Sequence, residues 1–328
     1  QYLLGLTLFY ALVNTVTSAR RMELAGWVML AGTAVLAGLG LVGTAWGTEV
    51  KFLPVELSQR IPRLMGAFWY SAGLHPNLVG GVLATLAPLT AAYAWSARLW
   101  PLRLFLWLLF LIASFALVLT QSRGALLGFA VALVVVAIGC KRRWLWLVLG
   151  LAAIVALLVA LYGVPSALDS AIETAGTSAV LSGELRLELL SRGIYMLQDF
   201  PLTGIGLGMF PQVLPILYPS LLMGIGGEVR SVHNLYLQTG IDHGLPGLIA
   251  YLSFLMLLWV IGIRAIHSSR GRPWEPLAIG LLGGLAAYCT HGMVDVIWRT
   301  PRSSPIIWGC WGLLTAAWCW TRASGRAD

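Results

Sequence analysis

The stretch RSVHNLYLQTGIDHGLPGLIAYL, residues 230–252, joins a polar front end to an apolar run. From Leu235 onward the side chains are mostly apolar, which suits a helix that crosses a bilayer. A charged side chain at the bilayer centre costs about 2.5–3.5 kcal/mol on insertion scales. Polar groups at the start of a membrane helix therefore indicate a functional role. Here they are Arg230, His233, Asn234, Gln238, Asp242 and His243. We therefore expect these groups to line a functional cavity at the mouth of a membrane helix.

The composition of the whole chain indicates a membrane protein. Of its 328 residues, 59% are hydrophobic and only 10% are charged, and the mean hydropathy is +0.83. Soluble domains carry about 25% charged residues, so we predict an all-α, polytopic transmembrane helical bundle. A span needs about 20 apolar residues, and nine segments qualify. They are residues 2–18, 24–46, 76–96, 100–121, 123–140, 144–162, 235–263, 275–297 and 304–321.

The spans and the basic residues together predict a topology. Residues 1–162 hold six spans with an external loop at 47–75, residues 163–234 form a long external loop, and residues 235–328 hold three spans. The positive-inside rule assigns twelve of the 21 Lys and Arg to the cytoplasmic side, with the C-terminus inside. This rule explains the net charge of +8 better than nucleic-acid binding does. Because the chain starts with Gln1 inside an apolar run, we expect further sequence upstream.

The long external loop contains a predicted amphipathic helix at residues 182–200. Ser182 can cap it, and Glu188 with Arg192 forms a favourable pair one turn apart. One face holds Leu185, Leu189 and Leu197, and this face suits either the membrane surface or the bundle. The glycines and prolines of FPLTGIGLGMFP, residues 200–211, then end the helix.

Three arginines lie on the side predicted to be external, where the positive-inside rule disfavours them. They are Arg123 in QSRGALLG (121–128), Arg186, and Arg230 three residues before His233. Each has an ordinary explanation as a surface or headgroup charge. Together with a histidine they favour a phosphate-bearing ligand, because the planar guanidinium fork matches phosphate oxygens.

His233 is the candidate for proton transfer. Imidazole titrates close to neutral pH, although a lone histidine at a helix mouth is often structural. Asn234 and Asp242 share a helix face beside it and are candidates to orient the histidine or a substrate. GLHPNLVG, residues 73–80, forms a second external helix mouth, where Asn77 can line the same cavity.

No cofactor or metal is expected from the sequence. The chain has no paired Asp-x-Asp carboxylates, no Walker loop and no HExxH motif, and its four cysteines have no CxxC spacing. Arginine is then the evident counter-charge for phosphate groups, so any pyrophosphate chemistry is predicted to be metal-independent.

In its motifs and their order the chain resembles the bacterial O-antigen ligase and polymerase superfamily over about residues 70–320. The matching segments are QSRGALLG, Arg186 upstream of DFPLTGIGLGMF, HNLYLQTGIDHGLPGL (233–248) and HGMVDVIWRTPRSSPIIWGCWGL (291–313). The resemblance implies that Arg123 and Arg186 hold a pyrophosphate and that His233 is the catalytic base. Arg230 is added because it lies close to His233 in the sequence.

The resemblance implies an enzyme of the bacterial inner membrane with its active site facing the periplasm. Such an enzyme transfers a glycan from an undecaprenyl-pyrophosphate carrier to an acceptor hydroxyl, on a lipid A core sugar for a ligase or on another repeat unit for a polymerase. The expected partners are therefore this lipid-linked donor, a glycan or glycolipid acceptor and the lipid bilayer. A transporter of an anionic solute is the alternative from another class, since the same arginines would suit an anion site.

Overall fold

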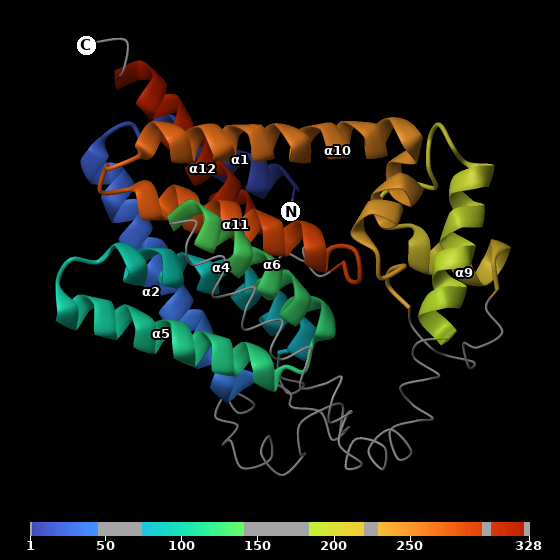
Figure 1. Ribbon diagram of the computed structural model, residues 1–328. Helices are drawn as coiled ribbons and strands as arrows, with labels where there is room; N and C mark the ends of the chain where they lie inside the picture. The colour runs from blue at the N-terminus through green and yellow to red at the C-terminus, as the bar shows by residue number, and fades with distance from the viewer. Residues whose placement is uncertain (1, 45–73, 141–183, 220–228, 297–302, 325–328) are drawn as a thin grey trace. The chain divides into compact units, whose positions relative to one another are not determined.

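The computed structural model of the chain describes residues 2–44, 74–140, 184–219, 229–296 and 303–324 (Figure 1). Within these ranges the chain is helical and contains no β-strand, and one isolated bridge joins Thr44 to Leu74. The prediction of an all-α fold is therefore confirmed. By contact clustering the chain divides into two compact units, described separately below.

The first unit comprises residues 1–169, 258–290 and 297–328. Its helices are α1 (Tyr2–Thr15), α2 (Ala19–Gly43), α4 (Pro76–Ser96), α5 (Trp100–Leu119), α6 (Arg123–Cys140), α11 (Glu275–His291) and α12 (Ser304–Ser324), together with the later part of α10 (Leu235–Ser269). Among the described residues, five helices are long and apolar enough to cross a membrane: α2, α4, α5, α6 and α10. The span predicted at 144–162 lies outside the described residues.

Short local signals set the ends of these helices. The Ser18 side chain accepts a hydrogen bond from the backbone N–H of Arg21 and caps α2. At α4, Pro76 occupies the first turn, and Nδ1 of His75 accepts from the backbone N–H of Asn77 at 3.2 Å. By contrast, α11 ends at His291, six residues before the end of the span predicted at 275–297. Asp295 therefore lies in a turn beyond the helix.

Small residues fill the core of the first unit. Its buried cluster is rich in alanine and includes Ala84, Ala87, Ala116 and Ala132. A Cβ atom on Gly128 would stand 2.8 Å from the carbonyl oxygen of Ala287, which shows how closely the two backbones approach. This close packing of small residues is typical of helices in membranes.

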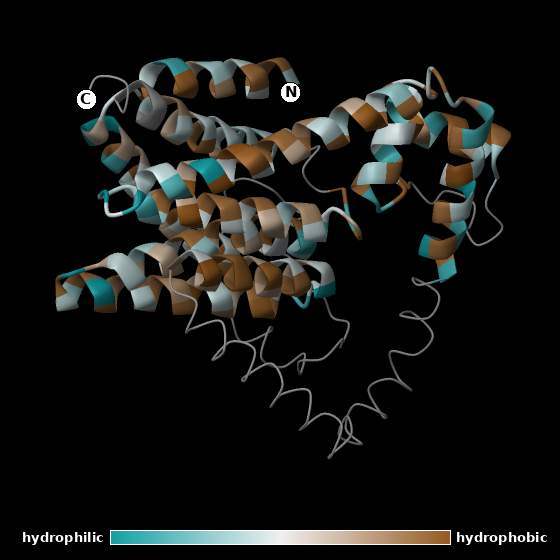
Figure 2. Cartoon of the chain, turned by 45° about the horizontal axis from the view of Figure 1, so that its top comes forward, coloured by the Kyte–Doolittle hydropathy of each residue, from teal (hydrophilic) through white to brown (hydrophobic). Residues whose placement is uncertain are grey.

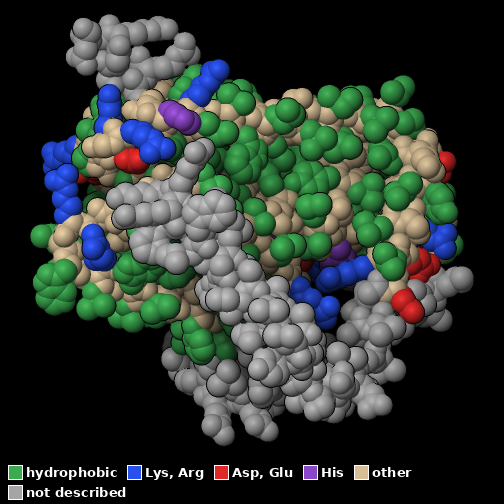
Figure 3. Space-filling model, viewed as in Figure 1, with side chains coloured by type: hydrophobic (Ala, Val, Ile, Leu, Met, Phe, Trp, Pro, Cys, Tyr) green, Lys and Arg blue, Asp and Glu red, His purple; other side chains and the backbone are tan. Residues whose placement is uncertain are grey.

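Apolar side chains cover much of the outer surface. The helices are coloured mainly apolar in Figure 2, and hydrophobic side chains cover the surface of α10 in Figure 3. Within α10, Ile249 is 63% exposed and Met256 is 70% exposed. Water would disfavour such a surface by about 25 cal/mol for each Å² of apolar area, whereas lipid chains would not.

The second unit comprises residues 170–257 and 291–296. It contains a helix at residues 184–199, the short helix α9 (Phe210–Leu217) and the front part of α10. Its core consists of Leu189, Met196, Phe210, Leu214, Val232 and Ile241. The predicted amphipathic helix is confirmed over 184–199, and Arg192 pairs with Glu188 at 3.3 Å. The predicted cap Ser182 lies outside the described residues.

The helix α10 bends at Gly244, whose φ of 70° and ψ of −175° are not helical. A loop of the second unit packs into this bend: Leu245 donates its N–H to the Pro201 carbonyl, and Ile205 donates to the Ile241 carbonyl, both at 2.7 Å. The sequence had predicted an uninterrupted span from residue 235. Gly244 instead interrupts α10, and the second unit contains α10 as far as Leu257.

Candidate functional site

His233 lies two residues before the first residue of α10, in a left-handed backbone conformation with φ at 54°. Its side chain is 34% exposed, and its Nδ1 atom lies 3.5 Å from Oδ1 of Asp295. This distance is at the outer limit for a hydrogen bond. Catalytic hydrogen bonds are often long before substrate binds and shorten in the complex. The Asp295 carboxylate therefore faces one nitrogen of an accessible imidazole.

Asn234 holds the two parts of this pair together. Its Oδ1 accepts from the backbone N–H of Leu237 at 2.9 Å, which caps the start of α10, while its Nδ2 donates to the Met293 carbonyl at 3.0 Å. The N–H of Leu235 also donates to the Gly292 carbonyl at 2.7 Å. The turn after α11 is thereby attached to the start of α10, and Asp295 is brought to His233.

A second hydrogen-bonded chain supports the backbone just before His233. The N–H of Val232 donates to Oε1 of Gln238, and Nε2 of Gln238 donates to Oδ1 of Asp242, both at 2.9 Å. Gln238 and Asp242 are each 2% exposed. Asp242 thus lies behind Gln238, where it supports the position of Val232.

Asp295 is 7% exposed, and its Oδ1 also accepts from the backbone N–H of Val296 at 2.7 Å. Burial acts to raise the pKa of Asp295. The interactions with His233, with the Val296 N–H and with the imidazole of His291 outweigh burial, so the pKa of Asp295 lies below its ordinary value. The carboxylate is consequently charged at neutral pH.

Sequence reasoning missed Asp295 as a partner of His233. The residue falls inside an apolar stretch, far along the chain from His233. The available signal was an acidic residue in a predicted span, which is costly unless it is paired. His291, only 1% exposed, was likewise not singled out.

Arg186 and Arg230 also belong to the second unit. Arg186 is exposed on the helix at 184–199, and Arg230 is exposed on the segment that leads to His233. Both guanidinium groups are thus accessible to a charged ligand in the unit that contains the His233–Asp295 pair.

Arg123 and Asn77 belong to the first unit. Arg123 begins α6 and is exposed, two residues after the buried Gln121, whose φ is 51°. The turn before Arg123 packs on α4, since a Cβ on Gly80 would stand 2.7 Å from Oγ1 of Thr120. Asn77, in the first turn of α4, therefore lies at the same end of this unit as Arg123. The structure thus groups five predicted site residues in one unit and these two in the other.

The His233–Asp295 pair could support proton transfer, and the same unit carries two exposed arginines. An imidazole whose Nδ1 faces a carboxylate presents its Nε2 to a substrate, as in other acid–base sites. Exposed guanidinium groups suit phosphate oxygens.

Residues 108–252 of the chain match the family model described as O-antigen ligase. The match includes Arg123, Arg186, Arg230, His233 and Asn234, and it ends before the turn that carries Asp295. No curated protein sequence matches the chain. Residues 108–252 are therefore similar to the O-antigen ligase family, in a chain whose described residues include five helices long and apolar enough to cross a membrane.

Proposed function

We propose that the protein transfers a glycan from an undecaprenyl-pyrophosphate carrier to an acceptor hydroxyl, as an O-antigen ligase does, at the outer face of the bacterial inner membrane. The observation that carries this proposal is the pairing of His233 with Asp295 at 3.5 Å. A buried carboxylate that orients an accessible imidazole is the arrangement that general-base catalysis requires.

In the proposed reaction the acceptor oxygen attacks the anomeric carbon from the side opposite the leaving group. A new bond forms between this oxygen and the carbon, while the bond from the carbon to the pyrophosphate oxygen breaks. The electron pair leaves with the lipid diphosphate, and the configuration at the carbon inverts. The acceptor proton passes to Nε2 of His233, and Asp295 stabilises the imidazolium that forms.

Arginine side chains stabilise the charge that develops on the leaving diphosphate. Arg123, Arg186 and Arg230 are assigned this role, and no metal ion is required. Asn234 positions the dyad, and Asp242 supports the backbone before His233. Asn77 is assigned to the substrate cavity.

The deciding experiment is transfer in vitro by purified protein from a lipid-linked donor, in excess chelator. Two acceptors are compared: a lipid A core glycolipid, for ligase activity, and a second lipid-linked repeat unit, for polymerase activity. Product on the first acceptor alone supports the ligase, and product on the second alone supports the polymerase. Transfer that stops in EDTA and returns with magnesium would contradict the proposal that arginine side chains stabilise the leaving diphosphate without a metal ion. If no glycan is transferred and an anionic solute crosses proteoliposomes, the protein is a transporter.

A further inference from the structure

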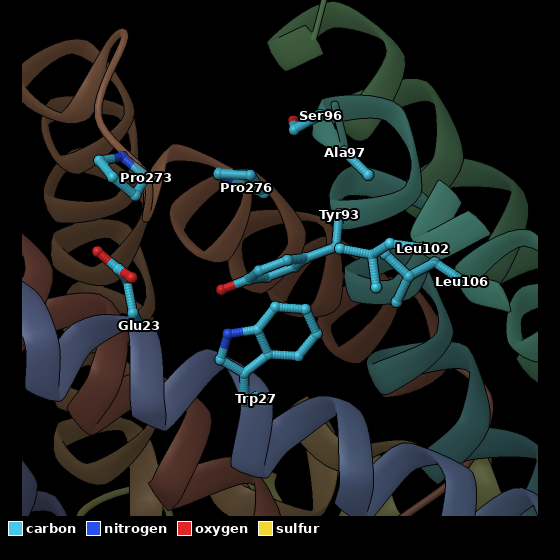
Figure 4. Close-up of a pocket in the computed structure, with 9 residues that line it drawn as sticks. All are labelled: Glu23, Trp27, Tyr93, Ser96, Ala97, Leu102, Leu106, Pro273 and Pro276. Carbon is cyan, nitrogen blue, oxygen red and sulfur yellow. The ribbon is translucent and has the colours of Figure 1, made fainter. Parts of the chain in front are cut away.

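A cavity of about 180 Å³ lies within the first unit, between the ends of four helical segments. Its walls include Trp27 of α2, Leu102 and Leu106 of α5, and Pro273 and Pro276 at the start of α11 (Figure 4). These residues lie near the start of α5, whereas Arg123 follows its end. The cavity is therefore separate from the arginine assigned above to the donor.

Two polar groups in the cavity wall lack protein partners. Glu23 is the one charged residue among those that line the cavity, and it forms no hydrogen bond or ion pair with any described residue. Tyr93 is 8% exposed, and within the described residues its hydroxyl has no hydrogen-bond partner. Figure 4 shows the hydroxyl end of Tyr93 directed toward the side of the cavity where Glu23 lies. The buried Tyr93 hydroxyl points to a ligand, because buried polar groups in proteins are nearly always paired. The half-buried Glu23 lines the same cavity.

The aromatic rings beside Glu23 favour a cation. The rings of Trp27 and Tyr93 are 5.9 Å apart between centroids and tilted by 53°. Aromatic faces attract ammonium groups, and a carboxylate beside them adds charge attraction. The combination of Glu23, Trp27 and Tyr93 thus matches an ammonium group.

The surroundings of the cavity favour a lipid as the carrier of this ammonium group. Apolar side chains next to it are exposed on the outside of the helices, including Val28 at 61%, Leu99 at 69% and Trp100 at 74%. The guanidinium of Arg103 donates to the carbonyl of Ala97, a lining residue, at 2.6 Å, so a positive charge lies at the rim. A phospholipid with an amine in its headgroup would place its phosphate near Arg103 and its acyl chains along the outer apolar surface.

We propose that this cavity is a binding site for an aminophospholipid, with the ammonium group held by Glu23, Trp27 and Tyr93. Bound there, the lipid would join α2, α4, α5 and the turn before α11 at the ends of their spans. This site is independent of the proposed glycan transfer.

The test is native mass spectrometry of the purified protein in mild detergent, after exchange into lipids with identical acyl chains. Phosphatidylethanolamine, phosphatidylcholine and phosphatidylglycerol are compared. For the wild type we expect about a tenfold preference for phosphatidylethanolamine over phosphatidylglycerol, which corresponds to about 1.4 kcal/mol. Glu23→Gln, which keeps the size of the side chain, should abolish this preference. Tyr93→Phe, which removes only the hydroxyl, should reduce it. Glu184→Gln, at an exposed carboxylate of the second unit, should leave it unchanged.

Equal retention of the amine lipid and phosphatidylglycerol by the wild type would overturn the proposal. An unchanged preference in Glu23→Gln would do the same, because the carboxylate would then not contact the headgroup. Phosphatidylcholine has a quaternary ammonium without N–H donors. If it binds as well as phosphatidylethanolamine, the assignment to a hydrogen-bonded primary amine is wrong. Thermal stability in detergent, measured for each variant, shows whether a lost preference reflects misfolding.

Discussion

Nδ1 of His233 and Oδ1 of Asp295 lie 3.5 Å apart, although one residue precedes α10 and the other follows α11. Asn234 links the two segments through its hydrogen bond to the Met293 carbonyl. The contact leaves Nε2 of His233 available to a substrate. Asp295 is accordingly a positioning residue that acts through the imidazole.

Asp295→Asn should lower kcat for glycan transfer, by no more than the roughly 10²–10⁴-fold that a general base contributes. The KM for the lipid-linked donor should stay near the wild-type value, because the arginines remain. The pH profile of kcat should also change, which a merely structural role would not produce. Glu184→Gln, at an exposed carboxylate of the same unit, is the control. Equal kinetics for Asp295→Asn and the wild type would remove Asp295 from the mechanism.

His233→Ala should lose most transfer, by about 10²–10⁴-fold, since this is the usual contribution of a general base. Donor binding, measured separately by equilibrium binding to the detergent-solubilised variant, should persist. His243→Ala is the control, because His243 is exposed at the bend of α10 and has no assigned chemistry. Normal transfer by His233→Ala would exclude the general-base role.

Arg123→Lys keeps the positive charge but loses the planar fork that binds phosphate oxygens in pairs. We expect a large loss of transfer for both Arg123→Lys and Arg123→Ala, with normal membrane insertion. Arg103→Lys is the control, since Arg103 lies at the opposite end of α5 and donates to the Ala97 carbonyl. The assay is transfer at saturating acceptor with increasing donor. Wild-type rates for both Arg123 variants would show that Arg123 does not bind the donor.

Much of the fold could be predicted because the signals are local. The helix predicted at 76–96 is α4, and the helix predicted at 123–140 is α6. Apolar length, Pro76 at a first turn and the glycine-rich break after residue 199 are all properties of short segments. The pairing of Glu188 with Arg192 was predictable for the same reason, since it depends only on helical spacing.

The parts that could not be predicted depend on contacts between distant segments. Hydrogen bonds from the loop at residues 201–205 stabilise the bend at Gly244. The apolar pattern of α10 does not predict these contacts. The His233–Asp295 contact requires α11 to end at His291, whereas apolar composition extends the predicted span to residue 297. Hydrophobic periodicity detects the length of an element but not its tertiary partner.

Gly204→Ala should destabilise the second unit more than Gly208→Ala does. Both positions have positive φ values, 63° and 76°, so both variants carry a backbone cost of about 1–2 kcal/mol. Only at Gly204 would the new Cβ also meet backbone atoms, at 2.6 Å from Asp242 and from His243, whereas the space at Gly208 is open. Thermal unfolding in detergent measures the difference. Equal losses of Tm would show that the loop does not pack at the bend as described.

Acid should weaken the fold through Asp295, because the pKa of this carboxyl is lowered in the folded protein. A carboxyl with a lowered folded pKa stabilises the fold above its unfolded pKa, which is about 3.9 for Asp. This stabilisation is lost as pH falls through the folded pKa. The wild type should therefore have a higher Tm than Asp295→Asn at neutral pH, and the gap should narrow below about pH 4. The measurement is Tm in detergent for both proteins from neutral pH into the acid range, with Glu184→Gln, at an exposed carboxylate, as the control. A gap that stays constant, or that widens in acid, would contradict the charged pairing of Asp295.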